Sequence, residues 1–334
     1  MRILLILTGG TIACKIEDNV INADSNTAYD ILSLYNQAYP KNSIEFTTIQ
    51  PFTILSENYT ANTYNTLIKY LYSCNFESYD GVIITHGSDT LSYTSALVGM
   101  LFNNLNLPII LTAADYPLSN PNSNGLSNFS ACVEFIKSKI SSGVFTAYGK
   151  PNNTQIYLAT RIVEADPITD QFTPFGNGVV AQVQHNIITD INEELLLYIK
   201  QKKEKPFTKA PFIKDNILLI KTYPNQCFSS YSLDTIKAVV VYMYHSATAC
   251  TVGTDTNILN FIKHCNQCGK PVYLASYKNK KDEYATSCEI DRLNINKLYN
   301  ISKESAYIKA LLAYNQSQTP PEKVMKTNIY FECQ

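Results

Sequence analysis

The sequence of 334 residues has no tryptophan, no long apolar run and no excess of charge of either sign. It contains 27 Lys+Arg and 28 Asp+Glu residues, a net charge of −1, so its charge predicts neither nucleic acid nor an anionic membrane as a partner. No window is long and apolar enough to predict a membrane-spanning helix. The apolar start is too short for a signal peptide, and we therefore expect a cytoplasmic protein.

Several ligand-binding patterns are also missing. A dinucleotide fingerprint would need a third glycine opening a helix after Gly9-Gly10, and a phosphate loop would need Gly-Lys-Ser/Thr; neither occurs. One CxxC pair is present, Cys265 and Cys268, but a zinc site needs four ligands and no second pair has matching spacing. We therefore expect no metal and no cofactor. The plainer alternative for the CxxC pair is a helix end closed by Gly269.

Nine cysteines are scattered along the chain, and an odd count argues against a disulfide framework. We expect them to be buried free thiols in a reducing compartment. The 24 tyrosines are most simply explained as core and surface packing in a chain without tryptophan.

The chain is organised around its first segment. Ile3 to Leu7 form a continuous apolar run, and Thr8-Gly9-Gly10-Thr11 follows. A short apolar run ended by glycines is typical of a buried strand in a parallel sheet. Open α/β sheets bind their ligands beyond the carboxyl ends of such strands, so Thr11 lies where chemistry is expected.

A second segment repeats this pattern. The predicted strand at 81–85 runs into His86-Gly87-Ser88-Asp89-Thr90. Two hydroxyls with a carboxylate, near backbone N–H groups, suit amide hydrolysis: one hydroxyl attacks the carbonyl, the other relays a proton, and the N–H groups stabilise the oxyanion. A hydroxyl is a weak nucleophile until a base takes its proton, so a further group is required.

Along the rest of the chain, apolar runs bounded by turn residues alternate with stretches of helical periodicity. Further strands are predicted at 44–49, 108–112, 144–147, 155–161, 216–221, 238–244 and 271–275. Helices are predicted at 28–37, 62–72, 91–104, 128–140, 191–201, 231–237, 256–265 and 303–314. A polar loop is predicted at 14–26, and 164–190 shows a mixed pattern.

This alternation predicts an α/β protein with two doubly wound parallel-sheet domains, the N-terminal one larger and the C-terminal one smaller. The pattern restarts after the charge run Lys202–Lys205, which suits a solvated linker. We therefore predict a domain at 1–190 that carries the active site, a linker at 191–213 and a second domain at 214–334.

The two motifs Thr8–Ala13 and Thr85–Thr90 together resemble the bacterial-type L-asparaginase/glutaminase family, in its cytoplasmic, type I-like form. Further similar segments are Leu55-Ser56-Glu57-Asn58, Pro108 to Thr112, Pro117-Leu118-Ser119, Ser123-Asn124-Gly125 and Asn128-Phe129. The resemblance covers nearly the whole chain and thins in its C-terminal third.

The resemblance implies a role for each matching residue. Thr11 corresponds to the nucleophile and Ser88 to the second catalytic hydroxyl, where the family usually has threonine. Asp89 and Glu57 are implied to hold the substrate α-amino group, and Ser56 its α-carboxylate. Further substrate contacts are expected from the small residues at three positions, Gly10, Gly87 and Ala114.

The implied reaction converts L-asparagine to L-aspartate and ammonia without a metal or cofactor, with L-glutamine as a poorer substrate. The resemblance also implies a homodimer or homotetramer whose sites are completed by a neighbouring subunit. Opposite charges in the pocket would select a zwitterionic amino acid over a simple amide.

Two departures from the family pattern concern catalysis. No lysine occurs between Lys150 and Lys200, although the family has one there to activate the second hydroxyl. Arg161 and Glu164 are the candidates to replace it; a guanidinium stays protonated and could only supply charge, whereas Glu164 could act as a base. The family's mobile tyrosine after the nucleophile is also missing, and Tyr29 is the nearest. Asn124 replaces a common aspartate.

Plainer interpretations exist for several of these residues. Ser88 and Asp89 could cap the helix that starts at Leu91. Ser56 and Glu57 could be ordinary loop residues, and His86 is more simply a core or turn histidine. His245 and Ser246 follow the strand predicted at 238–244. The sequence favours neither a role at an interface nor the absence of a role for them.

At the level of function, the missing lysine and tyrosine favour two alternatives. One is a catalytically impaired homologue that binds an amino acid or acts as a regulatory protein. The other is an amidase for a different amide substrate.

Overall fold

The computed structural model describes residues 1–17, 20–201, 207–278, 284–293 and 295–333. The charge run Lys202–Lys205 lies outside these residues. The chain divides into two compact units, Met1–Lys205 and Pro206–Gln334. Our predicted boundaries at 190 and 213 stay predictions. Within the described ranges, no helix combines the length and apolarity that crossing a membrane requires.

The first unit is built on an eight-stranded sheet in the order β12-β11-β8-β7-β6-β5-β1-β4. Five strands are parallel: β1 (Arg2–Leu7), β4 (Glu45–Ile49), β5 (Gly81–Thr85), β6 (Pro108–Thr112) and β7 (Gly143–Lys150). Three antiparallel strands extend it: β8 (Asn153–Leu158), β11 (Val179–Gln184) and β12 (Ile187–Ile191).

The antiparallel extension was not predicted. β7 ends at Lys150 and β8 begins at Asn153, a connection far too short for the crossover that a parallel pair needs. The region at 164–190, whose pattern was mixed, contains β11, β12 and the small pair β9 (Ile162–Val163) and β10 (Thr173–Pro174). With this addition, the prediction of an α/β fold with parallel sheets in both units is confirmed.

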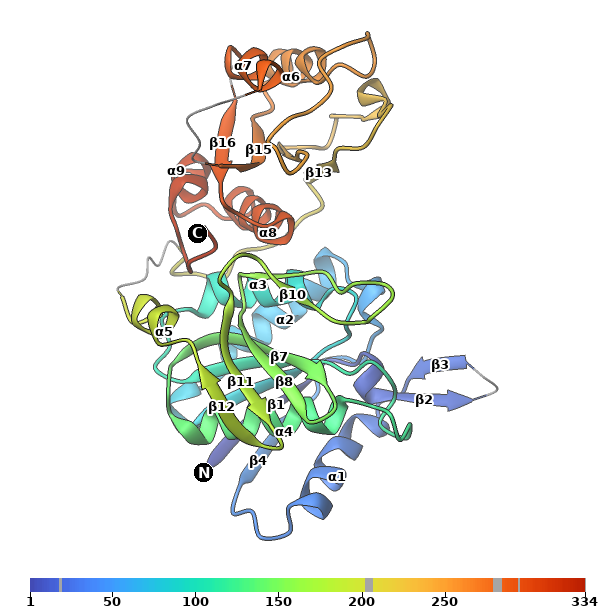
Figure 1. Cartoon of the computed structure of the whole chain (residues 1–334), viewed down its shortest axis with the longest axis vertical. Coiled ribbons are helices and arrows are strands. Elements are labelled where there is room, and N and C mark those ends of the chain that lie inside the picture. The colour runs from blue at the N-terminus through green and yellow to red at the C-terminus, as the bar shows by residue number, and fades with distance from the viewer. Residues whose placement is uncertain (18–19, 202–206, 279–283, 294, 334) are drawn as a thin grey trace. The chain divides into compact units, whose positions relative to one another are not determined.

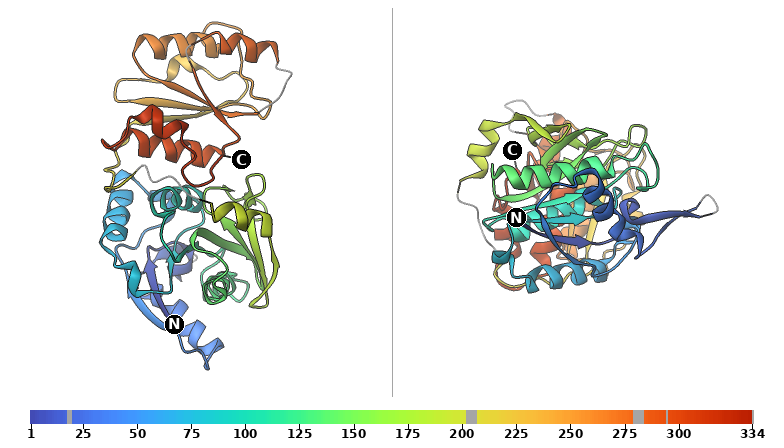
Figure 2. Two further views of the ribbon diagram at one scale, coloured as in Figure 1. Left: turned by 90° about the vertical axis from the view of Figure 1, so that its left-hand side faces the viewer. Right: turned by 90° about the horizontal axis from the view of Figure 1, so that it is seen from below.

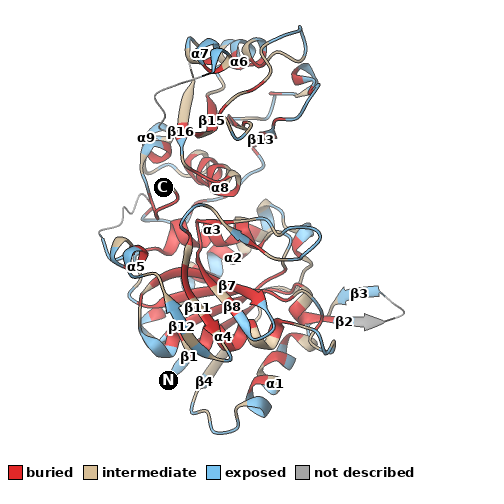
Figure 3. Ribbon diagram, in the orientation of Figure 1, coloured by how far each residue is buried: buried red, intermediate tan, exposed pale blue. Residues whose placement is uncertain are grey.

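Helices cover both faces of the large sheet (Figures 1 and 2). α1 (Asp30–Ala38) and α4 (Gly125–Ser138) lie on one face, and α2 (Ala61–Ser73) and α3 (Leu91–Phe102) lie on the other. Figure 3 shows α3 and the central strands as buried, and the central strands β1, β5 and β6 accordingly consist mainly of apolar residues. α5 (Glu193–Ile199) packs against β11.

The segment after β1 differs from the polar loop that we predicted at 14–26. A short 3-10 helix, η1 (Thr11–Ala13), leads directly into an antiparallel hairpin of β2 (Cys14–Glu17) and β3 (Val20–Ala23). The hairpin projects from the large sheet in Figures 1 and 2. Three further 3-10 helices follow: η2 (Thr27–Tyr29), η3 (Ser56–Asn58) and η4 (Phe76–Ser78).

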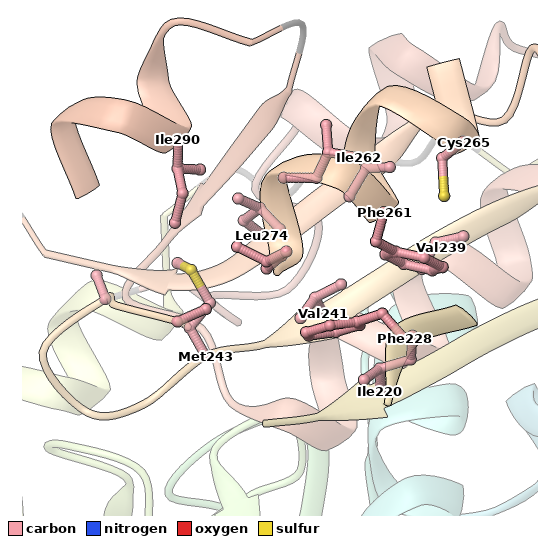
Figure 4. Close-up of a cluster of buried hydrophobic side chains, with 14 of the residues drawn as sticks. Ile220, Phe228, Val239, Val241, Met243, Phe261, Ile262, Cys265, Leu274 and Ile290 are labelled. Atoms are coloured by element: carbon pink, nitrogen blue, oxygen red, sulfur yellow. The ribbon is translucent and has the colours of Figure 1, made fainter. Parts of the chain in front are cut away.

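The second unit contains a parallel sheet of β13 (Ile217–Lys221), β14 (Ala238–Tyr242), β15 (Val272–Tyr277) and β16 (Asn296–Tyr299). Its other elements are η5 (Phe228–Ser230), α6 (Ile258–Gln267), α7 (Ala285–Asp291), α8 (Lys303–Tyr314) and α9 (Pro321–Lys326). Figure 4 shows the buried apolar cluster in which Val239, Val241 and Leu274 of the sheet meet Phe261 and Ile262 of α6.

The helix predicted at 231–237 is wrong. The chain there is irregular, and the Ser232 hydroxyl binds the Asp234 carboxylate and accepts from the Asp234 N–H, a local alternative to helical hydrogen bonds. His245 lies exposed in a turn after β14.

The CxxC pair marks the end of α6, as the plainer alternative held. Cys268 caps the helix and Gly269 follows with a left-handed φ of 65°. Burial raises the pKa of the Cys265 thiol to about 12. All nine cysteines are free, but the prediction that they are buried is wrong for Cys227, Cys268 and Cys288, which are exposed.

Candidate active site

Two turns meet at the carboxyl edge of the large sheet. β1 and β5 are parallel neighbours with Leu7 opposite Thr85, so the segments that follow them leave the sheet side by side. The Thr8 N–H and hydroxyl both donate to the Thr85 carbonyl, at 3.3 and 2.7 Å. A Cβ placed on Gly10 would lie 2.3 Å from Cα and N of Gly87, so the two turns are in backbone contact.

A third segment joins this contact. The Gly10 N–H donates to the Ile54 carbonyl at 3.0 Å, and the Ile54 N–H donates to the Thr8 carbonyl at 3.2 Å. This ladder carries the chain to Ser56, whose Oγ lies 2.4 Å from a Cβ placed on Gly87. The Thr90 hydroxyl donates to the Ser56 carbonyl at 3.0 Å. Only glycine therefore fits at 10 and 87, where three backbones converge.

Ser56 is the buried polar group of this junction. Its side chain is 2% exposed, and within the described chain its Oγ has no hydrogen-bond partner. A buried hydroxyl without a partner costs free energy unless a ligand or water satisfies it, which marks functional positions.

The carboxyl groups of Asp89 and Glu57 lie next to each other. Partial burial of its carboxyl group raises the pKa of Asp89, and the negative charge of Glu57 and a hydrogen bond with it raise that pKa further. The charge of Glu57 also adds to burial in raising the pKa of the Cys14 thiol to about 11. Two adjacent carboxylates favour a cation between them.

Thr11 begins η1 and is half-buried beside this junction. Ser88 is half-buried and Asp89 exposed, in the turn before α3. The N-cap of α3 is Thr90, without a side-chain capping bond, so Ser88 and Asp89 do not cap this helix with their side chains. The capping alternative is therefore wrong.

His86 is fully buried between the turns. Its Nδ1 donates to the Gly87 carbonyl at 2.7 Å, because a carbonyl can only accept, and its Nε2 has no partner in the described chain. Burial lowers the pKa of His86 to about 4. The Tyr59 ring packs 4.6 Å from the imidazole, and its hydroxyl donates to Thr8 Oγ1 at 3.0 Å. His86 is thus a neutral core histidine, as the plainer interpretation held. Tyr29 lies exposed.

A pocket of about 270 Å³ opens beside Ser88. It is lined by Ser88, Asp89, Asp115, Tyr148, Glu164, Ala165, Asp166, Pro167 and Asp170. The structure thus brings Glu164 to the same pocket as Ser88. The Tyr93 hydroxyl donates to Glu164 Oε1 at 2.7 Å and orients this carboxylate.

Arg161 is placed elsewhere. Its guanidinium donates to the Asn177 carbonyl at 3.2 Å and lies 5.8 Å from the centre of the Tyr198 ring. The described residues that line the Ser88 pocket do not include Arg161. Of the two candidates to replace the lysine, Glu164 alone shares a pocket with Ser88.

Sequence reasoning missed six of the pocket residues: Asp115, Tyr148, Ala165, Asp166, Pro167 and Asp170. Asp115 comes three residues after β6, directly past the buried Ala113-Ala114, so the rule that pointed to Thr11 and Ser88 could have found it. Tyr148 lies near the end of β7. Asp166 and Asp170 gave no signal, because the chain between β9 and β10 has no regular pattern.

Among the residues that the structure describes, no three His, Cys, Asp or Glu side chains are arranged to hold a metal ion. The functional groups of the site are two hydroxyls on turns that touch, an adjacent pair of carboxylates and a buried serine. Such a set can bind an ammonium group and attack a carbonyl.

Comparisons with known proteins agree with this description. A glutamyl-tRNA(Gln) amidotransferase subunit from Methanosphaera stadtmanae is 26% identical over 97% of this chain and 75% of its own length. An L-asparaginase from Thermococcus kodakarensis is 30% identical over 48% of this chain and 47% of its own length. The structure of a thermostable L-asparaginase from the same organism matches with a TM-score of 0.79 at 19% identity, covering 100% of this chain and 99% of that one.

The resemblance inferred from the two motifs is thereby confirmed. Residues 2–195 match the family model described as "Asparaginase, N-terminal", which spans more than half of the chain. This protein is a member of the asparaginase family.

Proposed function

We propose that this protein is an amidohydrolase that converts L-asparagine to L-aspartate and ammonia, with Thr11 as the nucleophile. The observation that carries the proposal is the backbone contact between Gly10 and Gly87, which holds the turns of Thr11 and Ser88 together. The family membership of residues 2–195 supports it. L-Glutamine is proposed as a poorer substrate.

The site has groups that suit the α-ammonium and the α-carboxylate of an amino-acid substrate. Asp89 and Glu57 would hold the α-ammonium group, and its positive charge would relieve their mutual repulsion. The buried Ser56 hydroxyl would donate to the α-carboxylate and gain the partner that it otherwise lacks. Gly10, Gly87 and Ala114 are proposed as further substrate contacts. A zwitterionic amino acid would therefore bind better than a simple amide.

In the chemical step, Thr11 Oγ attacks the carboxamide carbon and gives up its proton. The C–N bond then breaks, ammonia leaves with a proton, and an ester on Thr11 remains. Water attacks this ester, which releases L-aspartate and restores the hydroxyl. We propose that backbone N–H groups of the turns stabilise the oxyanion.

Proton transfer through Ser88 needs a base, and we propose Glu164 for this role. It shares the pocket with Ser88, and Tyr93 orients it. A carboxylate can accept a proton, which the guanidinium of Arg161 cannot do. Glu164→Gln keeps the shape and the bond from Tyr93, and it is expected to lower kcat more than it raises KM.

Ammonia release from L-asparagine tests the proposal, measured on the wild type and on Thr11→Ala. Thr11→Ala is expected to lower kcat/KM by about 10³-fold or more, because it removes the nucleophile. Thr66→Ala on α2 removes a hydroxyl that bonds only to its own helix and serves as the matched control. Equal ammonia release by Thr11→Ala and the wild type would refute a Thr11 nucleophile.

A binding or regulatory protein is the rival from another class, favoured by the missing lysine. Calorimetry with L-asparagine separates the two. Binding without any ammonia release by the wild type would favour the rival, whereas turnover excludes it.

A second candidate is the amide-hydrolysing component of an amidotransferase. It is favoured by the alignments to glutamyl-tRNA(Gln) amidotransferase subunits, which reach 97% of this chain for Methanosphaera stadtmanae and 99% for Thermofilum pendens. A higher kcat/KM for L-glutamine than for L-asparagine would favour it; the reverse supports the free asparaginase.

We further propose a homodimer or homotetramer, because the family that the chain resembles completes its sites with a neighbouring subunit. Light scattering after size-exclusion chromatography gives the mass, and a monomer would refute this. The cytoplasmic location stays a prediction.

A further inference from the structure

The pocket beside Ser88 carries an unusual charge. Four aspartates line it: Asp89, Asp115, Asp166 and Asp170. The described residues of its lining include no lysine, arginine or histidine. Carboxylates that share a small space repel one another, and this repulsion is relieved when a cation enters.

The aspartates are held in place by the backbone. Asp115 Oδ1 accepts from the N–H groups of Tyr116 and Asn124 at 2.8 and 3.0 Å. Asp166 Oδ1 accepts from the N–H groups of Ile168 and Thr169 at 3.0 and 2.9 Å. These carboxylates are therefore preorganised at the pocket wall rather than free to swing into solvent.

Tyr148 gives an independent sign of a ligand. Its side chain is 1% exposed, it lines the pocket, and its hydroxyl has no hydrogen-bond partner within the described chain. Burial raises the pKa of this phenol, and the charges of Asp115 and Asp170 raise it further. The Tyr148 hydroxyl can both donate and accept a hydrogen bond, and the carboxylates beside it can accept one. These groups are therefore available to a bound ligand.

The geometry distinguishes between two kinds of cation. A divalent metal needs several oxygen ligands at one point, and the described residues provide no group of three that could hold one. The carboxylates instead surround a space of about 270 Å³, just below the usual range of small-molecule pockets, about 300 Å³ and above. The space suits an organic ammonium group with its carbon chain.

We propose that this pocket binds a protonated amine that forms part of the amide substrate. The inference rests on the proposed function, and it assigns the substrate class as amides that carry an ammonium group besides the amino-acid head. Glu57 does not line the pocket, so the site for the α-ammonium group, between Asp89 and Glu57, is separate. Asp89 belongs to both sites, and Ser88 lines the pocket. We therefore expect the second ammonium group of the substrate to be attached close to the amide that is cleaved.

The first experiment measures binding of 1,3-diaminopropane to the full chain by calorimetry. One site is expected in the wild type, weakening as salt is added because salt screens charge. The double variant Asp115→Asn/Asp170→Asn keeps the shape and the backbone bonds, and it is expected to raise Kd about tenfold or more. Tyr148→Phe removes the hydroxyl alone and is also expected to raise Kd. Asp190→Asn, an exposed aspartate on β12, is the control and leaves Kd unchanged.

The second experiment compares N4-(2-aminoethyl)-L-asparagine with its neutral analogue N4-propyl-L-asparagine. Hydrolysis breaks the amide C–N bond, adds water across it and releases the corresponding amine. The wild type is expected to favour the charged compound about tenfold in kcat/KM, and the double variant is expected to lose this preference.

Two results would overturn the inference: no saturable binding of the diamine, or the same Kd in the wild type and the double variant. Mg²⁺ binding that the double variant abolishes, without diamine binding, would replace it with a metal site. Diamine binding does not require turnover, so it survives if the enzyme releases no ammonia from L-asparagine. Conversely, ammonia release without diamine binding removes only this inference.

Discussion

At the scale of single residues, the site depends on two glycines that touch. Gly10 has a left-handed φ of 75°, and any side chain on it would enter the backbone of Gly87. The sequence showed both glycines and the hydroxyls beside them. It could not show the contact, because the distance between two turns far apart in the sequence is set by the pairing of β1 with β5.

Gly10→Ala is expected to abolish ammonia release and to lower the free energy of unfolding by about 2–4 kcal/mol, from left-handed strain and overpacking together. Gly269→Ala is the matched control. Gly269 has a φ of 65° but nothing within 4 Å of the added Cβ, so strain of about 1 kcal/mol should remain without any loss of activity. Activity retained in Gly10→Ala would contradict the contact. Denaturant unfolding and the ammonia assay measure both effects.

His86 links the site to the pH dependence of stability. Its pKa is lowered to about 4 in the fold and is about 6.5 in the unfolded chain, so the neutral form stabilises the fold above pH 6.5. This stability is lost as pH falls from 6.5 to 4, by about 3 kcal/mol for this group.

NMR titration of the imidazole carbons measures the pKa of His86 directly. Denaturant unfolding at pH 7 and pH 4.5 measures the loss in the free energy of unfolding. A His86 that titrates near pH 6.5 would show that the site is open to water.

At the scale of elements, the predictions succeeded where one local rule governed the segment. The apolar runs at 81–85 and 108–112 coincide with β5 and β6, and 303–314 coincides with α8. The predictions failed where pairing with a neighbouring strand determines the secondary structure. β9 to β12 are short or half-exposed and gain their structure from neighbouring strands. Five of the nine residues that line the Ser88 pocket lie between β9 and β10, and the sequence pointed only to Glu164 among them.

The start of α2 offers a test of local control. Thr60 and Thr63 form a capping box in which each side chain bonds the backbone of the other. Thr60→Ala is expected to lower the free energy of unfolding by about 1 kcal/mol while kcat/KM for L-asparagine stays unchanged. Thr60→Ser, which keeps the hydroxyl, should restore stability. A matching loss of activity would mean that α2 positions the neighbouring Ser56 segment.

At the scale of the whole molecule, the chain comprises two units with separate cores, and we expect each unit to be able to unfold without the other. In the second unit, Lys309 and Glu332 form an ion pair at 2.7 Å, 1% and 0% exposed. Glu332 also accepts from the N–H groups of Ile329 and Tyr330, which fixes the C-terminal segment. No pattern in the sequence indicates this pair, because its partners lie on different segments and neither belongs to a motif.

Lys309→Met is expected to destabilise the second unit by about 3–5 kcal/mol, because it leaves a carboxylate buried without its cation. Hydrogen exchange should show the loss in amides at 207–333 and leave those at 1–201 protected. Lys326→Met, an exposed lysine of α9, is the control. Equal loss of protection in both units would show that they unfold as one.

The chain between Glu164 and Phe172 leaves and rejoins the fold at one place. β9 and β10 pair at its base, and the Asp166 N–H donates to the Gln171 carbonyl across it at 2.9 Å. A segment closed on itself in this way can be exchanged as a cassette without rebuilding the strands that carry Thr11 and Ser88. Under the proposed function, such an exchange would change which amide is accepted and leave the proposed nucleophile in place.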